Sequence, residues 1–152
     1  MPVIRDEDDS PGRRPQHKLK FRRLPGLFEI CQLPCDASVP DWATSGPFIS
    51  ITRSEEELSI VCLGDNVPAG VKAERHWMCF KLEGPFPFAQ TGVLASFIDP
   101  LAEQGVPIFA ISTYDTDYVL VQESYARVTL ATLREAGHEL WPPDDSWQKL
   151  IE

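Results

Sequence analysis

Cysteine and histidine are the residues of this chain best suited to chemistry, and the cysteines form no recognisable site. Cys31 and Cys35 are separated by three residues, a spacing that a metal or redox site could use. Zinc, however, takes about four ligands at short separations, and no histidine lies near this pair in the sequence. Cys62 and Cys79 lie inside apolar runs and are expected to be buried thiols that pack as small hydrophobic groups. We therefore expect neither a metal nor a cofactor.

The three histidines give no catalytic pattern either. His17, His76 and His138 are far apart in the sequence, and none lies beside an evident nucleophile. The motifs Gly-x-Ser-x-Gly, Gly-x-x-x-x-Gly-Lys and His-Glu-x-x-His do not occur. We expect that the chain is not an enzyme. A site that folding assembles around His138 or Cys31 is the alternative that the sequence leaves open.

Composition limits the class of protein and of partner. The 152 residues suffice for one ordinary domain or two very small ones, and 43% hydrophobic with 24% charged residues is typical of a soluble globular protein. The 14 basic and 23 acidic residues give a net charge of −9, which argues against nucleic acid as the main partner. No apolar run reaches the roughly 18 residues that span a bilayer. The start of the chain has no signal-peptide core. We expect a cytoplasmic protein without a membrane partner.

The two ends of the chain differ from its middle. Residues 1–17 are rich in proline and glycine and mix both charge signs, so we expect a disordered tail. Residues 142–152 form a C-terminal extension. Two tryptophans, Trp141 and Trp147, flank a Pro-Pro pair there. These rings either pack back over a sheet or dock a partner.

The first half of the chain is typical of short strands. Two apolar segments, 19–24 and 27–33, are interrupted by a Pro-Gly pair, and residues 41–43 could form one helical turn. A polar Ser-Glu-Glu-Glu turn separates two further strands. The run 71–84 has the length of two joined strands.

Two helices stand out in the second half. Apolar residues recur at helical spacing over 93–102, with Thr91 as the expected N-cap, Gly105 as the stop, and a bend caused by Pro100 near Ser96. A hairpin over 107–122 follows, and Ser124 is expected to cap a second helix that ends at Gly137. A short strand closes a β-α-β-β-α-β order, the ferredoxin-like α+β plan with helices on one face of an antiparallel sheet.

An internal similarity predicts two units. The hairpin over 50–62 resembles the hairpin over 111–122, and each has an acidic turn. We therefore expect a first, reduced unit over 18–75, with very short helices, and a second unit over 76–141.

Three segments resemble a known family: SITRSEEELSIVC (50–62), FKLEGPFPF (80–88) and TGVLASFIDPLAEQGVPIFAISTYDTDYVLV (91–121). They are similar to ACT-domain proteins with two tandem ACT units, such as the regulatory half of aspartokinases and the CASTOR-type arginine sensors. The resemblance covers residues 19–140. It implies two ferredoxin-like βαββαβ units that together bind an amino acid between units, often across a dimer interface.

The resemblance also implies a position for that site. Its matching loop is 88–93, where Gly92 would let an α-carboxylate approach backbone amides at a helix N-terminus. Asp115 or Asp117 would hold the ammonium group. The expected ligand-binding residues are Thr91, Gly92, Val93, Leu94, Ser112, Thr113, Asp115, Thr116 and Asp117. The alternative is structural, because Asp115-Thr116 also suits a plain hairpin turn and Gly92 a helix start.

From these observations we expect a small regulatory protein that senses an amino acid and catalyses nothing itself. The acidic balance favours a cationic or zwitterionic effector, with arginine and lysine as candidates. Family members commonly associate, so a homodimer is expected. The alternative is a protein–protein interaction module that has lost effector binding.

Overall fold

The computed structural model describes residues 16–143, and both the expected N-terminal tail and the C-terminal extension lie almost wholly outside them. The strands are β1 (Lys20–Arg23), β2 (Phe28–Leu33), β3 (Ser50–Arg53), β4 (Leu58–Leu63), β5 (Lys72–Leu82), β6 (Ile108–Ser112), β7 (Asp117–Gln122) and β8 (Glu139–Leu140). The helices are α1 (Val93–Glu103) and α2 (Ala126–Glu135), with short 3₁₀ turns at Asp41–Ala43, Gly64–Asn66 and Glu123–Tyr125. In the described part of the chain, no helix is long and apolar enough to cross a membrane.

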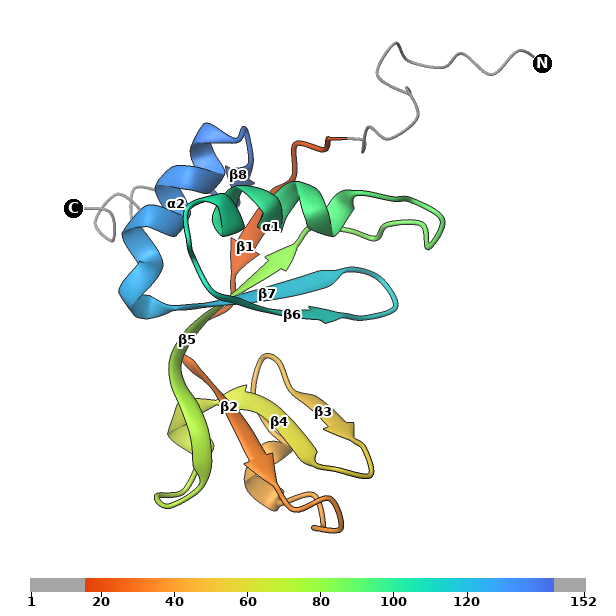
Figure 1. Cartoon of the computed structure of the whole chain (residues 1–152), viewed down its shortest axis with the longest axis vertical. Coiled ribbons are helices and arrows are strands. Elements are labelled where there is room, and N and C mark those ends of the chain that lie inside the picture. Colours follow the sequence, from red (N-terminus) through yellow and green to blue (C-terminus); the bar gives the residue numbers. More distant parts are fainter. Residues whose placement is uncertain (1–15, 144–152) are drawn as a thin grey trace.

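Strand β5 joins the two halves of the molecule (Figure 1). Its first residues pair with β2, and its last residues pair with β1 on one edge and β7 on the other. The register between β2 and β5 shifts near the junction, where His76 has a φ of 66°. The run that was expected to be two joined strands is therefore one strand that carries a bulge and serves two units.

The first unit keeps the ferredoxin-like strand order without long helices. Its strands lie in the order β3-β4-β2-β5, with antiparallel pairing throughout. The 3₁₀ turns at 41–43 and 64–66 occupy the places of the two helices. The expectation of very short helices in this unit is confirmed.

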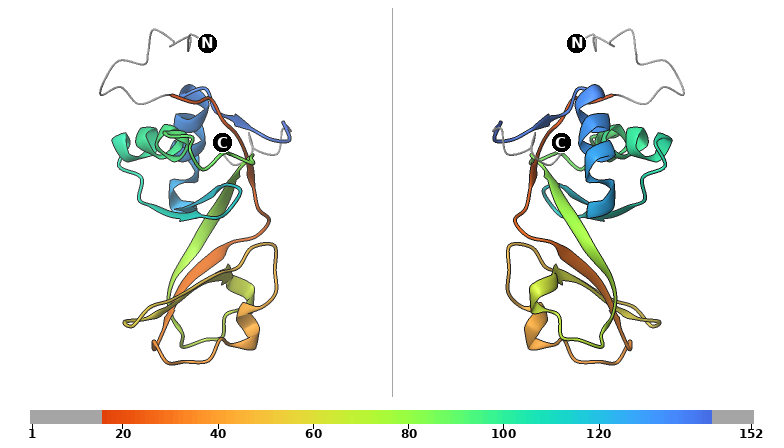
Figure 2. Two further views of the ribbon diagram at one scale, coloured as in Figure 1. Left: turned by 90° about the vertical axis from the view of Figure 1, so that its right-hand side faces the viewer. Right: turned by 90° about the vertical axis from the view of Figure 1, so that its left-hand side faces the viewer.

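The second unit follows the same plan and adds a strand. From β5 onward the element order is β-α-β-β-α-β, as predicted. Strand β1 lies between β5 and β8, antiparallel to the former and parallel to the latter. Figure 2 shows β1 and β2 following β5 from one unit into the other. We propose that the two units divide after residue 75. Strand β1 precedes this division in the sequence but completes the sheet of the second unit.

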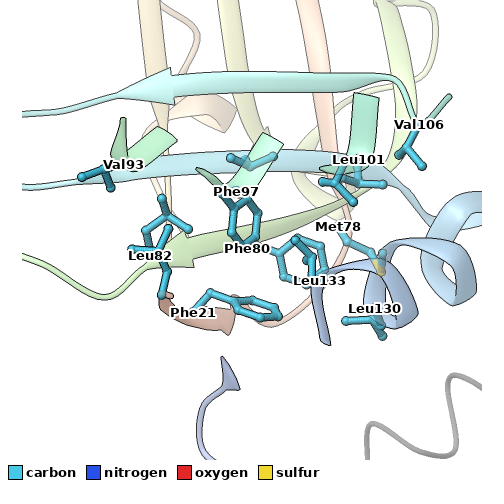
Figure 3. Close-up of a cluster of buried hydrophobic side chains, with 13 residues drawn as sticks. Phe21, Met78, Phe80, Leu82, Val93, Phe97, Leu101, Val106, Leu130 and Leu133 are labelled. Atoms are coloured by element: carbon cyan, nitrogen blue, oxygen red, sulfur yellow. The ribbon is translucent and has the colours of Figure 1, made fainter. Parts of the chain in front are cut away.

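Helices α1 and α2 bury one face of the second sheet (Figure 3). Phe97, on α1, is fully buried and packs edge-on against Phe21 of β1, with ring centroids 5.2 Å apart. Phe21 also packs edge-on against Phe80 of β5. A strand that is distant in the sequence therefore contributes an aromatic ring to the centre of this core.

The opposite face of the second sheet packs against the first unit. Trp77 and Cys79 of β5, with Leu120 of β7, form a second cluster with Phe28 and Val61 of the first unit. Side chains alternate between faces along a strand, so β5 supplies the helix-covered core with Met78, Phe80 and Leu82 and this inter-unit cluster with Trp77 and Cys79.

The helix boundaries correct two predictions. Thr91 is not the N-cap of α1, because Gly92 holds that position with a left-handed φ of 80°. Ser124 is not the cap of α2 either, because it lies inside the 3₁₀ turn and Tyr125 precedes the helix. The stops at Gly105 and Gly137 are confirmed, each with a positive φ just after its helix.

Candidate functional site

The loop before α1 lies against the turn of the β6–β7 hairpin. The backbone N–H of Phe86 donates to the carbonyl oxygen of Asp115 at 2.9 Å. The rings of Phe88 and Tyr114 meet edge-on, with centroids 4.9 Å apart. A Cβ on Gly84 would lie 2.9 Å from the Asp115 carbonyl oxygen, so the close approach requires glycine there. The two predicted segments are thus joined, but through residues that precede Thr91.

The hairpin residues are engaged with one another. The hydroxyl of Ser112 donates to the carboxylate of Asp117, its cross-strand partner. The hydroxyl of Thr113 donates to the carbonyl of Thr116 at 3.0 Å. Thr116 is buried, and its hydroxyl donates to the Leu82 carbonyl at 2.7 Å. Thr116 therefore anchors the turn to β5, and the carboxylates of Asp115 and Asp117 are the charged groups of this turn.

The first carbonyls of α1 are hydrogen-bonded. Among residues 16–143, no side chain caps the helix at Gly92. The Ser96 hydroxyl donates to the Gly92 carbonyl at 2.6 Å, and His17 lies 3.0 Å from the Thr91 carbonyl through Nε2. Four of the predicted ligand-binding residues, 91–94, lie at the start of α1. Among them, Val93 is buried and packs in the helix-covered core. Leu94 is half-buried against the same core.

His138 forms buried hydrogen bonds that the sequence did not indicate. Its Nδ1 accepts the Leu19 N–H at 3.0 Å, and its Nε2 lies 2.8 Å from the Ser96 carbonyl. A carbonyl can only accept, so Nε2 carries the proton and the ring is neutral. The Ser96 carbonyl needs this donor because Pro100, four residues on, has no N–H. Burial lowers the pKa of His138, and the bond to Ser96 opposes that shift.

Three of the four thiols are poor candidates for chemistry. Burial raises the pKa of Cys31 and of Cys79 to about 12, and it raises the pKa of Cys62 as well. A protonated thiol is neither a nucleophile nor a metal ligand. Within residues 16–143, no group of three or more histidine, cysteine or acidic side chains is placed to hold a metal ion.

A cleft lies between the two units, away from the predicted site. Its volume is about 270 Å³. It is lined by Ser50 and Thr52 of β3, Ser59 and Val61 of β4, and Phe109, Ala110, Ile111 and Ser112 of β6. Only Ser112 was among the predicted residues. The cleft could not be inferred locally, because its walls are hairpins about 60 residues apart whose approach depends on the bend of β5.

Comparison with protein families gives two matches along the chain. A family model for the ACT domain matches residues 72–135, and a model for an N-terminal domain matches residues 26–70. The two models meet at the start of β5.

Solved structures share most of this arrangement. The protein Atu0741 from Agobacterium tumefaciens is 43% identical, with a TM-score of 0.78 over 82% of this chain and 92% of that chain. The aspartate kinase of Clostridium acetobutylicum is 10% identical, with a TM-score of 0.56 over 84% of this chain and 37% of that chain. At that identity the kinase shows the fold alone.

Two curated relatives are partial matches. The bovine cytosolic arginine sensor for mTORC1 subunit 1 is 36% identical over 88 residues, which is 49% of this chain and 27% of the relative. The human protein CASTOR3P is 28% identical over 107 residues, which is 62% of this chain and 66% of the relative. The chain therefore spans less than two thirds of either relative.

Proposed function

This chain belongs to the ACT-domain family and is CASTOR-like, and on that basis we propose that it is a regulatory module that binds an amino acid without catalysing a reaction. The observation that carries the proposal is the docking of the loop before α1 on the β6–β7 turn. It places an uncapped helix start and two carboxylates on adjoining segments of one unit. The similarity to a bovine arginine sensor supports the amino-acid class.

Each end of an amino acid has a partner in the proposed site. The α-carboxylate would accept from the first backbone amides of α1, where the helix dipole favours a negative group. Thr91, Gly92 and Leu94 belong to that segment. The ammonium group would lie against Asp115 or Asp117, with Ser112 and Thr113 as neutral partners. Val93 and Thr116 hold the two segments in place from the protein interior.

The electrostatics of the turn favour a cationic effector. Burial raises the pKa of Tyr118, and Cys79, Asp115 and Glu83 raise it further. The carboxylates of Asp115 and Glu83 therefore act on the ring beside the turn, and a guanidinium or ammonium side chain would relieve that negative potential. Arginine and lysine are the effectors we propose. The name of the bovine relative also supports a cytoplasmic location.

We further propose a homodimer. Strand β3 pairs with β4 and strand β6 pairs with β7, so in the described sheet each has one edge without a neighbouring strand. An unpaired edge is a ready template for a strand of a second copy. Sedimentation at tens of micromolar should give a dimer mass, and a strict monomer would contradict the proposal.

Thermal unfolding against each of the twenty amino acids tests the sensor function. A ligand that binds only the folded state adds about 2.7 kcal/mol of stability at one hundred times its Kd. We expect arginine or lysine to raise the Tm, and D115N or D117N to reduce that rise. D65N, which removes an exposed carboxylate from the first unit, is the matched control and should leave the rise unchanged. No rise with any amino acid would contradict the proposal.

The second candidate function is a protein-interaction module. Phe88 and Tyr114 are 76% and 79% exposed although their rings touch, which is unusual for large apolar groups. A protein that ignores all twenty amino acids but loses a binding partner on F88A would support this function instead.

A further inference from the structure

Residues 17–19, which lead into β1, lie against the start of α1. The backbone N–H of His17 donates to the hydroxyl oxygen of Ser96 at 2.9 Å. The imidazole of His17 donates from Nε2 to the carbonyl oxygen of Thr91 at 3.0 Å, because a carbonyl can only accept. Two hydrogen bonds therefore hold this N-terminal segment, as we call residues 17–19, on α1 and on the loop that precedes it.

The ring of His138 makes a third hydrogen bond to the N-terminal segment. Its Nδ1 accepts the backbone N–H of Leu19 at 3.0 Å, and its Nε2 donates to the Ser96 carbonyl at 2.8 Å. His138 itself lies between α2 and β8. One side chain therefore joins three parts of the chain that are distant in the sequence: the N-terminal segment, α1, and the junction of α2 with β8.

Only the neutral ring of His138 can make both of its hydrogen bonds. Nε2 needs its proton to donate to Ser96, and Nδ1 needs its lone pair to accept from Leu19. A second proton would lie on Nδ1 and point at the Leu19 N–H, so that two donors would face each other. A buried N–H without an acceptor is unfavourable. Protonation therefore breaks the bond to Leu19 and keeps the bond to Ser96.

His17 responds differently to a proton. Its Nε2–H already donates to the Thr91 carbonyl, and a second proton on Nδ1 leaves that donor in place. Its other bond uses the backbone N–H, which does not titrate. Of these two histidines, His138 is therefore the one whose protonation breaks a contact of the N-terminal segment.

Burial governs the protonation of His138. The residue is 5% exposed. Burial lowers its pKa, and the hydrogen bond to Ser96 opposes that shift. The side chain of His17 is half-buried, and the charged side chains nearest to these contacts on each neighbouring element are exposed: Lys18, Lys20, Asp99, Arg134, Glu135 and Glu139. The ring is therefore neutral in the folded protein at pH 7, and it gains a proton readily only after it has separated from Leu19.

We propose that the hydrogen bond between His138 and Leu19 is an acid-sensitive latch, which holds the N-terminal segment on α1 when the ring is neutral and releases the segment when the ring is protonated. In the released state Nδ1 is solvated, and the bond from Nε2 to Ser96 remains. An exposed histidine has a pKa near 6.5, so opening becomes about tenfold more favourable for each pH unit below that value.

Release of the N-terminal segment would also reach the proposed effector site. His17 would leave the Ser96 hydroxyl and the Thr91 carbonyl, at the start of α1 and in the loop before it. That loop docks on the β6–β7 turn through Phe86 and Phe88. Acid would therefore weaken effector binding. This consequence assumes the proposed function, whereas the latch does not.

Amide hydrogen exchange of the unmodified full chain, followed by NMR at pH 7.5 and pH 5.5, tests the latch. Expressed as a protection factor, which removes the intrinsic pH dependence of exchange, the protection of the Leu19 N–H should fall about tenfold between the two pH values. The N–H of Val119, a fully buried residue of β7, should be better protected than that of Leu19 at both pH values, because the latch opens without unfolding the sheet. A long-range proton–nitrogen spectrum at pH 7.5 should show Nδ1 of His138 without a proton.

Two substitutions of His138 separate its acceptor from its donor. In H138N the amide oxygen takes the place of Nδ1 and does not titrate, so the protection of Leu19 should be the same at both pH values. In H138Q the amide nitrogen takes the place of Nε2 and the acceptor is lost, so the protection should be low at both pH values. H17N is the matched histidine control and should keep the tenfold fall of the unmodified chain.

The outcomes separate the latch from the proposed function. Protection of Leu19 that does not change with pH, that equals the protection of Val119, or that still falls in H138N overturns the latch. Titration with L-arginine and L-lysine at both pH values tests the consequence, and we expect acid to weaken binding more in the unmodified chain than in H138N. Absence of binding at either pH contradicts the proposed function, while the exchange data still decide the latch.

Discussion

The two units of this molecule share a plan of four strands, to which the second unit adds β1, but they differ in what covers the sheet. The second unit buries its outer face under two helices, with Phe97 at the centre of the contact. The first unit has 3₁₀ turns in place of helices, and its outer cluster combines Leu58 and Ile60 with the smaller Cys31, Ala43 and Cys62. A 3₁₀ turn covers less of a sheet than a helix, so smaller residues suffice in this cluster. The comparison teaches that strand order is retained when the helical layer is lost.

The largest predicted effect concerns the independence of the first unit. Residues 19–80 expressed alone should not fold, because β1 would lose β8, β5 would lose β7, and Phe21 would lose Phe97. A domain this small is marginal even with a complete core. Circular dichroism should show no cooperative thermal transition, with the full chain as the positive control. A cooperative transition would show that the units are independent.

The next prediction compares an aromatic ring of helix α1 with an aromatic ring of the 3₁₀ turn 41–43. F97A should destabilise the protein by about 3–5 kcal/mol, because it opens a cavity in a fully buried core. W42A removes a half-buried ring that the 3₁₀ turn 41–43 packs on the first unit, and it should lower stability by about 1–2 kcal/mol. Denaturant unfolding at a shared m-value measures both. V39A, at an exposed apolar position of the first unit, is the control and should stay within about 0.5 kcal/mol.

The third prediction concerns how the stability of the protein depends on pH through the buried ring of His138. Burial lowers the pKa of His138 below its ordinary value near 6.5, so the folded state binds fewer protons than the unfolded state. The contribution of His138 to stability is therefore fully present above pH 6.5 and is lost as the pH falls below it. Protonation would also remove the acceptor for the Leu19 N–H.

Tm measured from pH 8 to pH 5 checks this sign. We expect the Tm of the unmodified protein to fall more steeply below pH 6.5 than the Tm of H138F, which has no titrating ring. H76N, at an exposed position on β5 whose positive φ asparagine tolerates, is the matched histidine control. Equal slopes for the protein and H138F would contradict the predicted role.

The smallest predicted effect tests the corrected helix boundary. S124A should change the free energy of unfolding by less than about 0.5 kcal/mol, because Ser124 is exposed and caps no helix. A true N-cap would lose about 1 kcal/mol on the same change. A loss of that size by denaturant unfolding would restore Ser124 as the cap.

The sequence by itself determined the elements and the plan of each unit. Helical spacing over 93–102, alternation in the hairpins and the glycines after each helix are local patterns, and the structure confirms the elements that they predict. The ACT-family resemblance also came from residues that are read along the chain. The helix starts were less accurate, because Thr91 and Gly92 are both acceptable at a helix start by sequence, and backbone conformation decides between them.

Tertiary structure decided what depends on contacts between distant segments. Three features join residues more than 40 positions apart. They are the insertion of β1 between β5 and β8, the hydrogen bonds of His138 with Leu19 and Ser96, and the cleft against β6. The same contacts decide which predicted site residues are available to a ligand, since Val93 and Thr116 are buried and Asp115 is exposed. Burial is set by the neighbours that folding supplies, so residue type and spacing alone could not have separated these three.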